Sequence, residues 1–117
     1  MTLREKQSLF VELVAQLIIQ AETMGYELTF SEAWRSPEEA ARLAKAGKGI
    51  KNSLHTQRLA IDFNLFKNGK YLSTTDAHRP LGEWWEAQST DDYTCAWGGR
   101  FTRQDGGHYS LSHGGRQ

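Results

Sequence analysis

The chain has 117 residues, enough for one ordinary domain with a single hydrophobic core. Its 14 basic and 14 acidic residues balance, so charge gives no argument for nucleic acid or an anionic membrane as a partner. The single cysteine, Cys95, cannot form a disulfide within the chain, so the fold should not depend on oxidation. We expect one domain over residues 1–117, acting as a monomer.

The first residues do not resemble a signal peptide. The segment 1–7 is charged, and Glu12 and Gln16 interrupt the apolar run that follows. No segment approaches the roughly 20 apolar residues of a membrane span. The sequence therefore predicts a protein made in the cytoplasm, which another component would have to deliver to any target outside.

An amphipathic helix is predicted for residues 3–24. Apolar side chains recur at helical spacing from Phe10 to Ile18. Thr2 can cap this helix with Glu5 as its capping-box partner, and Gly25 is suited to end it. We interpret the helix as scaffold without a chemical role.

A strand is predicted for residues 26–34, which are rich in aromatic and β-favouring types. Arg35 follows directly. Its planar donor fork could bind a substrate carboxylate or the oxygen of a scissile carbonyl. The alternative is a surface arginine in an ion pair. A second helix should then begin at the cap Ser36 and run to about Ala46, where Gly47 ends it.

Residues 59–66 predict a strand with two different faces. One face carries Ile61, Phe63 and Leu65, and the other carries Ala60, Asp62 and Asn64. A carboxylate in so apolar a strand is costly unless a cation compensates its charge. His55 lies in the loop that enters the strand, and imidazole and carboxylate are both zinc ligands. The alternative is a solvated strand face beside a loop histidine.

Ser53 lies two residues before His55. Its hydroxyl could orient a metal ligand by hydrogen bonding, or it could be an ordinary turn serine.

We interpret the middle of the chain, from the hairpin turn to the helix after it, as structural scaffold without a chemical role. The Asn-Gly pair at residues 68–69 predicts a hairpin turn, because both residues accept positive φ at little cost. A helix should follow, capped by Thr75 or Asp76 and ending at about Gln88. We interpret His78, near its start, as a surface histidine.

Trp97 precedes two adjacent glycines, Gly98 and Gly99, which allow close approach of the backbone, as in the wall of a cleft. Trp97 therefore either lines a substrate groove or belongs to the core.

The last strand begins at His108, three residues after Asp105. Catalytic zinc typically has three protein ligands and one open position for water. His55, Asp62 and His108 would complete such a set and hold one zinc ion per chain. Asp105 would then be free to take a proton from the water. His113 points to the other face of the strand, which argues against it as a ligand.

The spacing of these residues resembles a known family. The matching motifs are Ser53-x-His55, Ala60-x-Asp62 and Asp105-x-x-His108, with further likeness in Glu32-Ala33-Trp34-Arg35-Ser36 and Trp97-Gly98-Gly99. They are similar to the zinc D-Ala-D-Ala carboxypeptidases and the phage L-alanyl-D-glutamate endopeptidases, which share a core with the Hedgehog signalling domain. The likeness covers residues 26–111. One departure is Arg58, where the family often has glycine; a bulky cation there could narrow the cleft or contact an acidic substrate.

The resemblance implies an α+β fold, with helices on one side of a small antiparallel sheet and the metal on the exposed side. It implies that zinc and Arg35 stabilise a developing oxyanion while Asp105 acts as the base. It also implies that Ser53 and Trp97, with Arg35, contact the substrate.

The implied activity is hydrolysis of a peptide bond in peptidoglycan stem peptides, by an L-Ala-D-Glu endopeptidase or a D,D-carboxypeptidase. A short chain without a signal peptide or a wall-binding domain resembles a phage endolysin or a virion-associated lysin that acts on the cell wall after release. One alternative is a non-catalytic, metal-holding domain of the same fold, such as a phage tail component. Asp105 weighs against it, because a structural site has no need of a spare carboxylate. The other is a metal-free fold with coincidental histidines.

Overall fold

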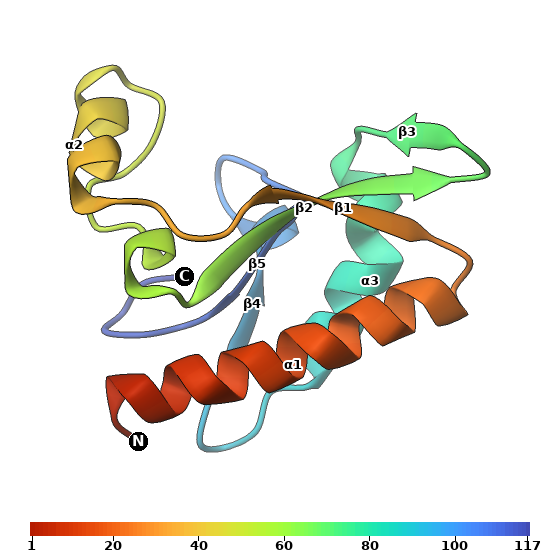
Figure 1. The fold of residues 1–117 in the computed structure, drawn as a ribbon, viewed down its shortest axis with the longest axis horizontal. Coiled ribbons are helices and arrows are strands. Elements are labelled where there is room, and N and C mark those ends of the chain that lie inside the picture. The colour runs from red at the N-terminus through yellow and green to blue at the C-terminus, as the bar shows by residue number, and fades with distance from the viewer.

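Figure 1 shows the computed structural model of the chain, which describes residues 1–117. The strands are β1 (Glu27–Glu32), β2 (Ala60–Lys67), β3 (Lys70–Leu72), β4 (Cys95–Trp97) and β5 (His108–Leu111). The helices are α1 (Leu3–Thr23), α2 (Pro37–Lys45) and α3 (Thr75–Ala87), with short 3-10 turns η1 (Leu54–Gln57) and η2 (Gly98–Arg100). None of the helices combines the length and the apolar character needed to cross a membrane.

The long helix α1 has the ends that the sequence predicts. The Thr2 hydroxyl accepts the Glu5 backbone N–H at 3.1 Å, and the Glu5 carboxylate accepts the Thr2 N–H at 3.0 Å. The chain turns after the helix at Gly25, whose φ of +82° favours glycine.

Strand β2 is the centre of an antiparallel sheet with the order β1-β2-β5-β4. Strand β1 pairs along one side of β2. On the other side, the first half of β2 pairs with β5 and the second half with β3. This register places Asp62 opposite His108, so two residues 46 positions apart in sequence lie side by side.

The predicted alternation along β2 is confirmed. Ile61, Phe63 and Leu65 are buried, whereas Asp62 and Asn64 are half-buried on the other face. The buried face packs on α1 and α3, where Phe10, Trp85 and Tyr109 form edge-to-face aromatic contacts. Figure 1 shows α1 and α3 forming this helical layer, with α2 apart from it near η1. The structure therefore confirms the α+β class, and the polar face of β2 is left open for a site.

The first strand is shorter than predicted, because the chain leaves the sheet after Glu32. Beyond this point the backbone turns to the loop that carries His55. The Ala33 carbonyl accepts a hydrogen bond from the His55 ring at 2.8 Å, and the Arg35 N–H donates to the His55 carbonyl at 3.2 Å. These contacts replace the strand pairing that residues 33 and 34 would otherwise make.

Two predictions about the start of α3 are wrong. The cap is Thr74 instead of Thr75 or Asp76, and its hydroxyl accepts the Ala77 N–H at 3.2 Å. His78 is buried rather than on the surface, since its ring packs near that of Tyr109 on β5. Its Nδ1 lies 3.0 Å from the Tyr109 hydroxyl, and burial lowers the pKa of the imidazole.

Candidate metal centre

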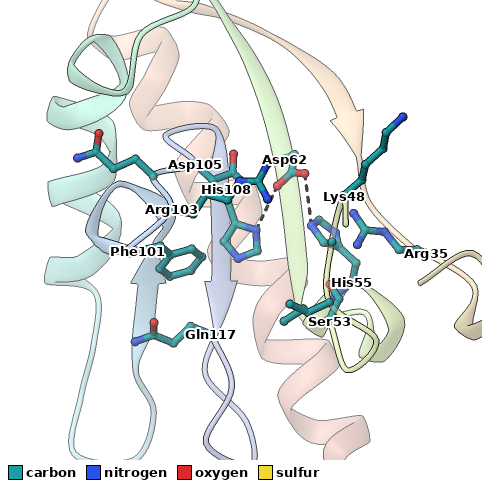
Figure 2. A pocket seen from close by; sticks show the side chains of 13 residues that line it. Arg35, Lys48, Ser53, His55, Asp62, Phe101, Arg103, Asp105, His108 and Gln117 are labelled. Carbon is teal, nitrogen blue, oxygen red and sulfur yellow. Dashed lines mark hydrogen bonds and ion pairs between the residues drawn. The ribbon is translucent and has the colours of Figure 1, made fainter. Parts of the chain in front are cut away.

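Three side chains converge on the open face of the sheet. One ligand atom each from His55, Asp62 and His108 lies within 4.8 Å of the other two. His55 Nε2 is 3.3 Å from Asp62 Oδ2, and His108 Nδ1 is 3.2 Å from Asp62 Oδ1. Figure 2 shows both imidazoles turned toward this carboxylate. The structure therefore brings together the three residues predicted as ligands.

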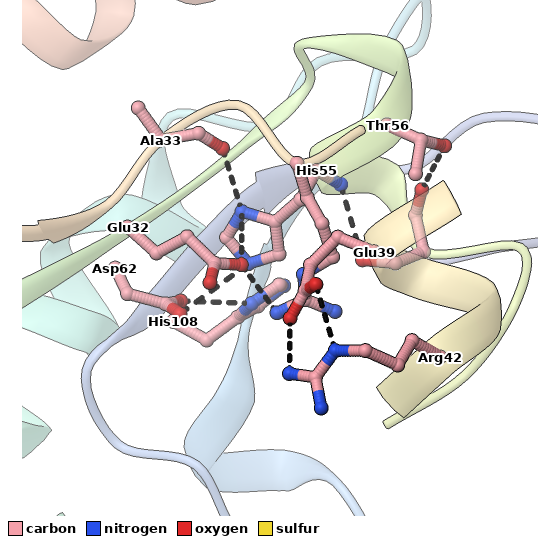
Figure 3. Close-up of polar contacts among 10 residues, drawn as sticks. Glu32, Ala33, Glu39, Arg42, His55, Thr56, Asp62 and His108 are labelled. Atoms are coloured by element: carbon pink, nitrogen blue, oxygen red, sulfur yellow. Dashed lines mark hydrogen bonds and ion pairs between the residues drawn. The ribbon is translucent and has the colours of Figure 1, made fainter. Parts of the chain in front are cut away.

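Each of these side chains is held by its own element. Asp62 projects from the polar face of β2, and His108 is its pairing partner on β5. His55 lies in η1, where the Ser53 hydroxyl accepts its backbone N–H at 3.2 Å. The ring Nδ1–H of His55 donates to the Ala33 carbonyl, visible in Figure 3. This bond fixes the tautomer and leaves the Nε2 lone pair facing Asp62.

The electrostatics of the site suit a cation. Burial disfavours the charged form of Asp62, but hydrogen bonds to His108 and His55 outweigh this and lower its pKa to about 2. Burial also disfavours imidazolium at His55, yet the carboxylate of Asp62 raises the pKa of that ring. The Nε2 of His108 is buried without a partner. Two imidazoles and one carboxylate are the donor set of a three-ligand zinc site, so these residues can hold zinc.

Asp105 lies beside this set in a turn that is tightly fixed. Its N–H donates to the Gly98 carbonyl at 2.9 Å, and its carbonyl accepts the His108 N–H at 3.1 Å. A Cβ on Gly98 would overlap the Asp105 carbonyl oxygen, so glycine is needed there. Burial of the carboxyl group and the nearby charge of Asp62 raise the pKa of Asp105. Asp105 lines the rim of the cleft that also contains the three ligand-type side chains.

Trp97 does not line the cleft, and the prediction that it contacts substrate is wrong. Its side chain is buried, with 1% exposed, because its ring packs against the bare backbones of Gly82 and Gly99. The indole N–H donates to the Gly106 carbonyl at 2.7 Å. Trp97 therefore holds the turn that carries Asp105 from inside the core.

Arg35 both faces the cleft and takes part in an ion pair. It lines the cleft in front of the metal centre, and its guanidinium also forms an ion pair with Glu32. The side chain is only 14% exposed, so this pair fixes its direction. Sequence reasoning assigned no role to Glu32. The available signal was an acidic residue three positions before Arg35, at the end of the strand that precedes it.

The cleft has a volume of about 440 Å³ and lies between the loop that carries His55 and the loop before His108. Its walls include residues that sequence reasoning missed because they lie in irregular loops, namely Lys48, Gly49, Ile50, Phe101, Arg103, Gln104 and Gln117. Ser53 lines it as well, in addition to capping η1.

Arg58 neither narrows this cleft nor faces a substrate in it, contrary to expectation. It ends η1 in the left-handed conformation, with φ at +57°. Its guanidinium lies 4.9 Å from the ring of Trp34, outside the cleft. Glycine would adopt this left-handed backbone without the strain that a side chain adds.

Comparison with known proteins agrees with this geometry. Residues 46–111, more than half of the chain, match the model of a family described as D-alanyl-D-alanine carboxypeptidase. The crystal structure of the L-Ala D-Glu endopeptidase ChiX from Serratia marcescens is similar, with a TM-score of 0.64 at 22% sequence identity. The match covers 86% of this chain and 78% of that chain, and it shows a shared fold. No curated protein sequence matches the chain.

Proposed function

Because the chain belongs to the D-alanyl-D-alanine carboxypeptidase family, we propose that it is a zinc peptidase that hydrolyses a peptide bond in peptidoglycan stem peptides. The observation that carries this proposal is the convergence of His55, Asp62 and His108 beside the unused carboxylate of Asp105. The fold shared with an L-Ala D-Glu endopeptidase supports a substrate in the cell wall. The bond cleaved is either L-Ala–D-Glu or D-Ala–D-Ala.

Each residue of the site has its own role in the proposed reaction. His55, Asp62 and His108 would hold the zinc ion, which when bound would act as a Lewis acid that polarises a carbonyl oxygen and lowers the pKa of water. Asp105 takes the proton of the attacking water and passes it to the leaving amine.

Arg35 faces the cleft with its guanidinium held by Glu32, so its donors are already oriented toward a carbonyl oxygen that gains negative charge. Ser53 supports His55 through its backbone and presents a hydroxyl to the cleft, where it can contact the substrate.

The biological setting that we propose is a phage endolysin or a virion-associated lysin. The protein would be made in the cytoplasm and would act as a monomer on the wall after release. This proposal rests on the sequence resemblance to phage endopeptidases.

Digestion of purified peptidoglycan tests the activity. Zinc-loaded protein should release new free amines, and mass spectrometry of the products should identify the bond from the new termini. Treatment with a chelator should abolish the release, and zinc should restore it. If the zinc-loaded protein releases no amine from walls of several chemotypes, the non-catalytic, metal-holding alternative is favoured.

A further inference from the structure

The cleft does not end at the metal centre. A second hollow of about 300 Å³ shares Asp62, Gln104 and Asp105 with the first one. The two clefts therefore meet where the reacting bond would lie. A substrate bound there has room for its groups on both sides of that bond.

The first cleft carries positive charge on both walls. Lys48 lies on the wall that also carries His55, and Arg103 lies on the opposite wall (Figure 2). Arg35 forms an ion pair with Glu32 and is assigned to the reacting carbonyl, whereas the side chains of Lys48 and Arg103 form no ion pair with the protein. Two exposed cations are thus free to bind an anionic group in this cleft.

The second cleft is chemically different. Its walls offer hydroxyl and amide groups, from Ser31, Asn64, Tyr71, Ser73, Thr75 and Gln104. Its acidic side chains are Asp62 and Asp105, and it has no lysine or arginine. Burial lowers the pKa of His78, so this ring adds no positive charge at neutral pH. The second cleft therefore suits uncharged, hydrogen-bonding groups and disfavours carboxylates.

We propose that Lys48 and Arg103 form a recognition site for substrate carboxylates, which places the acidic side of the substrate in the first cleft and its uncharged side in the second. The inference rests on the proposed function. A stem peptide cut between L-Ala and D-Glu divides in this way, because every carboxylate lies on the D-Glu side. A cut between the two terminal D-Ala residues leaves carboxylates on both sides. The charges of the clefts thus select the L-Ala–D-Glu bond.

A matched pair of substrates tests this recognition. The first is the peptide N-lactyl-L-Ala-D-Glu-L-Lys-D-Ala with γ-linked D-Glu, and the second carries D-isoglutamine in place of D-Glu. They differ by one carboxylate. We expect wild-type protein to show a kcat/KM about tenfold higher for the first, the lower end of what a hydrogen bond between charged groups supplies.

Variants then show which residues cause the preference for the peptide with the D-Glu carboxylate. Arg103→Gln and Lys48→Gln should each reduce the ratio toward one, and Arg103→Lys should keep part of it because the charge remains. Arg4→Gln is the matched control. Arg4 is an exposed residue of α1 that lines neither cleft. Its replacement lowers the net charge by the same amount as the Lys48→Gln and Arg103→Gln variants, but the ratio of kcat/KM for the two peptides should stay at the wild-type value.

Binding gives a readout that does not require turnover. Calorimetric titration of both peptides into the zinc-loaded Asp105→Asn protein should show the same preference, and Arg103→Gln in that background should remove it. Equal binding of both peptides, or a preference that survives both glutamine variants, would overturn the inference. Failure of the proposed function looks different, since wild-type protein would then release no amine from purified peptidoglycan whatever the binding ratio. Amine release from peptidoglycan without cleavage of either peptide would assign the activity to the D-Ala–D-Ala bond and overturn the inference.

Discussion

At the scale of single residues, Asp105 occupies a fixed turn at the rim of the metal centre but stands outside the predicted ligand set. Asp105→Asn keeps the size of the side chain and removes its ability to accept a proton. Zinc should stay bound, because the three ligands are untouched, and hydrolysis should fall by about 10²- to 10⁴-fold. Free-amine release and zinc content, measured together on both proteins, check this. Equal release by the zinc-loaded variant would rule out Asp105 as the base.

The pH dependence follows from the same residue. Burial and the charge of Asp62 raise the pKa of Asp105 above its ordinary value of 3.8. A base works only when deprotonated, so kcat/KM should fall as the pH drops through this raised pKa, at a higher pH than for an ordinary aspartate. A pH–rate profile of wild type and Asp105→Asn measures it. An identical acid limb in both proteins would assign the fall to another group.

The ligand set can be tested with two histidines of different placement. His108→Ala removes a side chain that faces Asp62, and zinc content should fall from about one ion per chain to near zero. His113→Ala is the control. Its ring lies 3.2 Å from Lys6 Nζ, away from the centre, so zinc should be retained. Elemental analysis of the purified proteins measures the zinc content of each variant. Full zinc retention in all three alanine variants, of His55, Asp62 and His108, would refute the ligand assignment.

At the scale of elements, the turn between η2 and β5 depends on β4 through one indole. Trp97→Phe removes the hydrogen bond to the Gly106 carbonyl and leaves a small void. We expect a loss of about 1–3 kcal/mol in the free energy of unfolding. Hydrolysis should fall as well, because the turn carries Asp105.

Trp84→Phe is the matched control, since that ring is half-buried on α3 and its N–H donates no hydrogen bond. Denaturant unfolding of the two variants provides the comparison. A loss no larger for Trp97 than for Trp84 would mean that the indole contact does not hold the turn.

Features that depend on neighbouring residues were predicted correctly from the sequence. The capping box of α1 and the turn at residues 68–69 depend only on neighbouring residues, so the sequence contains the whole interaction. The end of β1 and the burial of His78 depend on distant partners, His55 and Tyr109. A prediction from local propensity alone therefore made β1 too long and placed His78 on the surface.

At the scale of the whole molecule, the candidate metal centre joins the neighbouring elements η1 and β2 to β5, and His108 of β5 lies 46 positions after Asp62 of β2. Zinc bound to the three ligand residues should stabilise the folded protein, because the unfolded chain does not hold these residues close together. At free zinc about a hundredfold above the dissociation constant, the free energy of unfolding should rise by about 2.7 kcal/mol. Denaturant titration with and without zinc measures this gain. His108→Ala should show no gain; a similar gain in that variant would place the zinc elsewhere.

The sequence by itself determined the alternation of β2, which follows from periodicity, and the residues that the structure brings together at the metal centre. Those residues were found from their types, such as a costly carboxylate in an apolar strand, and from their spacing. The fold class followed from the resemblance of these motifs to a known family. The tertiary structure alone decided that Trp97 is a core support, that Arg58 faces away from the cleft and that Glu32 holds Arg35. It also decided that Lys48 and Arg103 lie on opposite walls of the cleft (Figure 2). The direction of a side chain in a loop depends on packing between segments distant in sequence, and no local pattern encodes it.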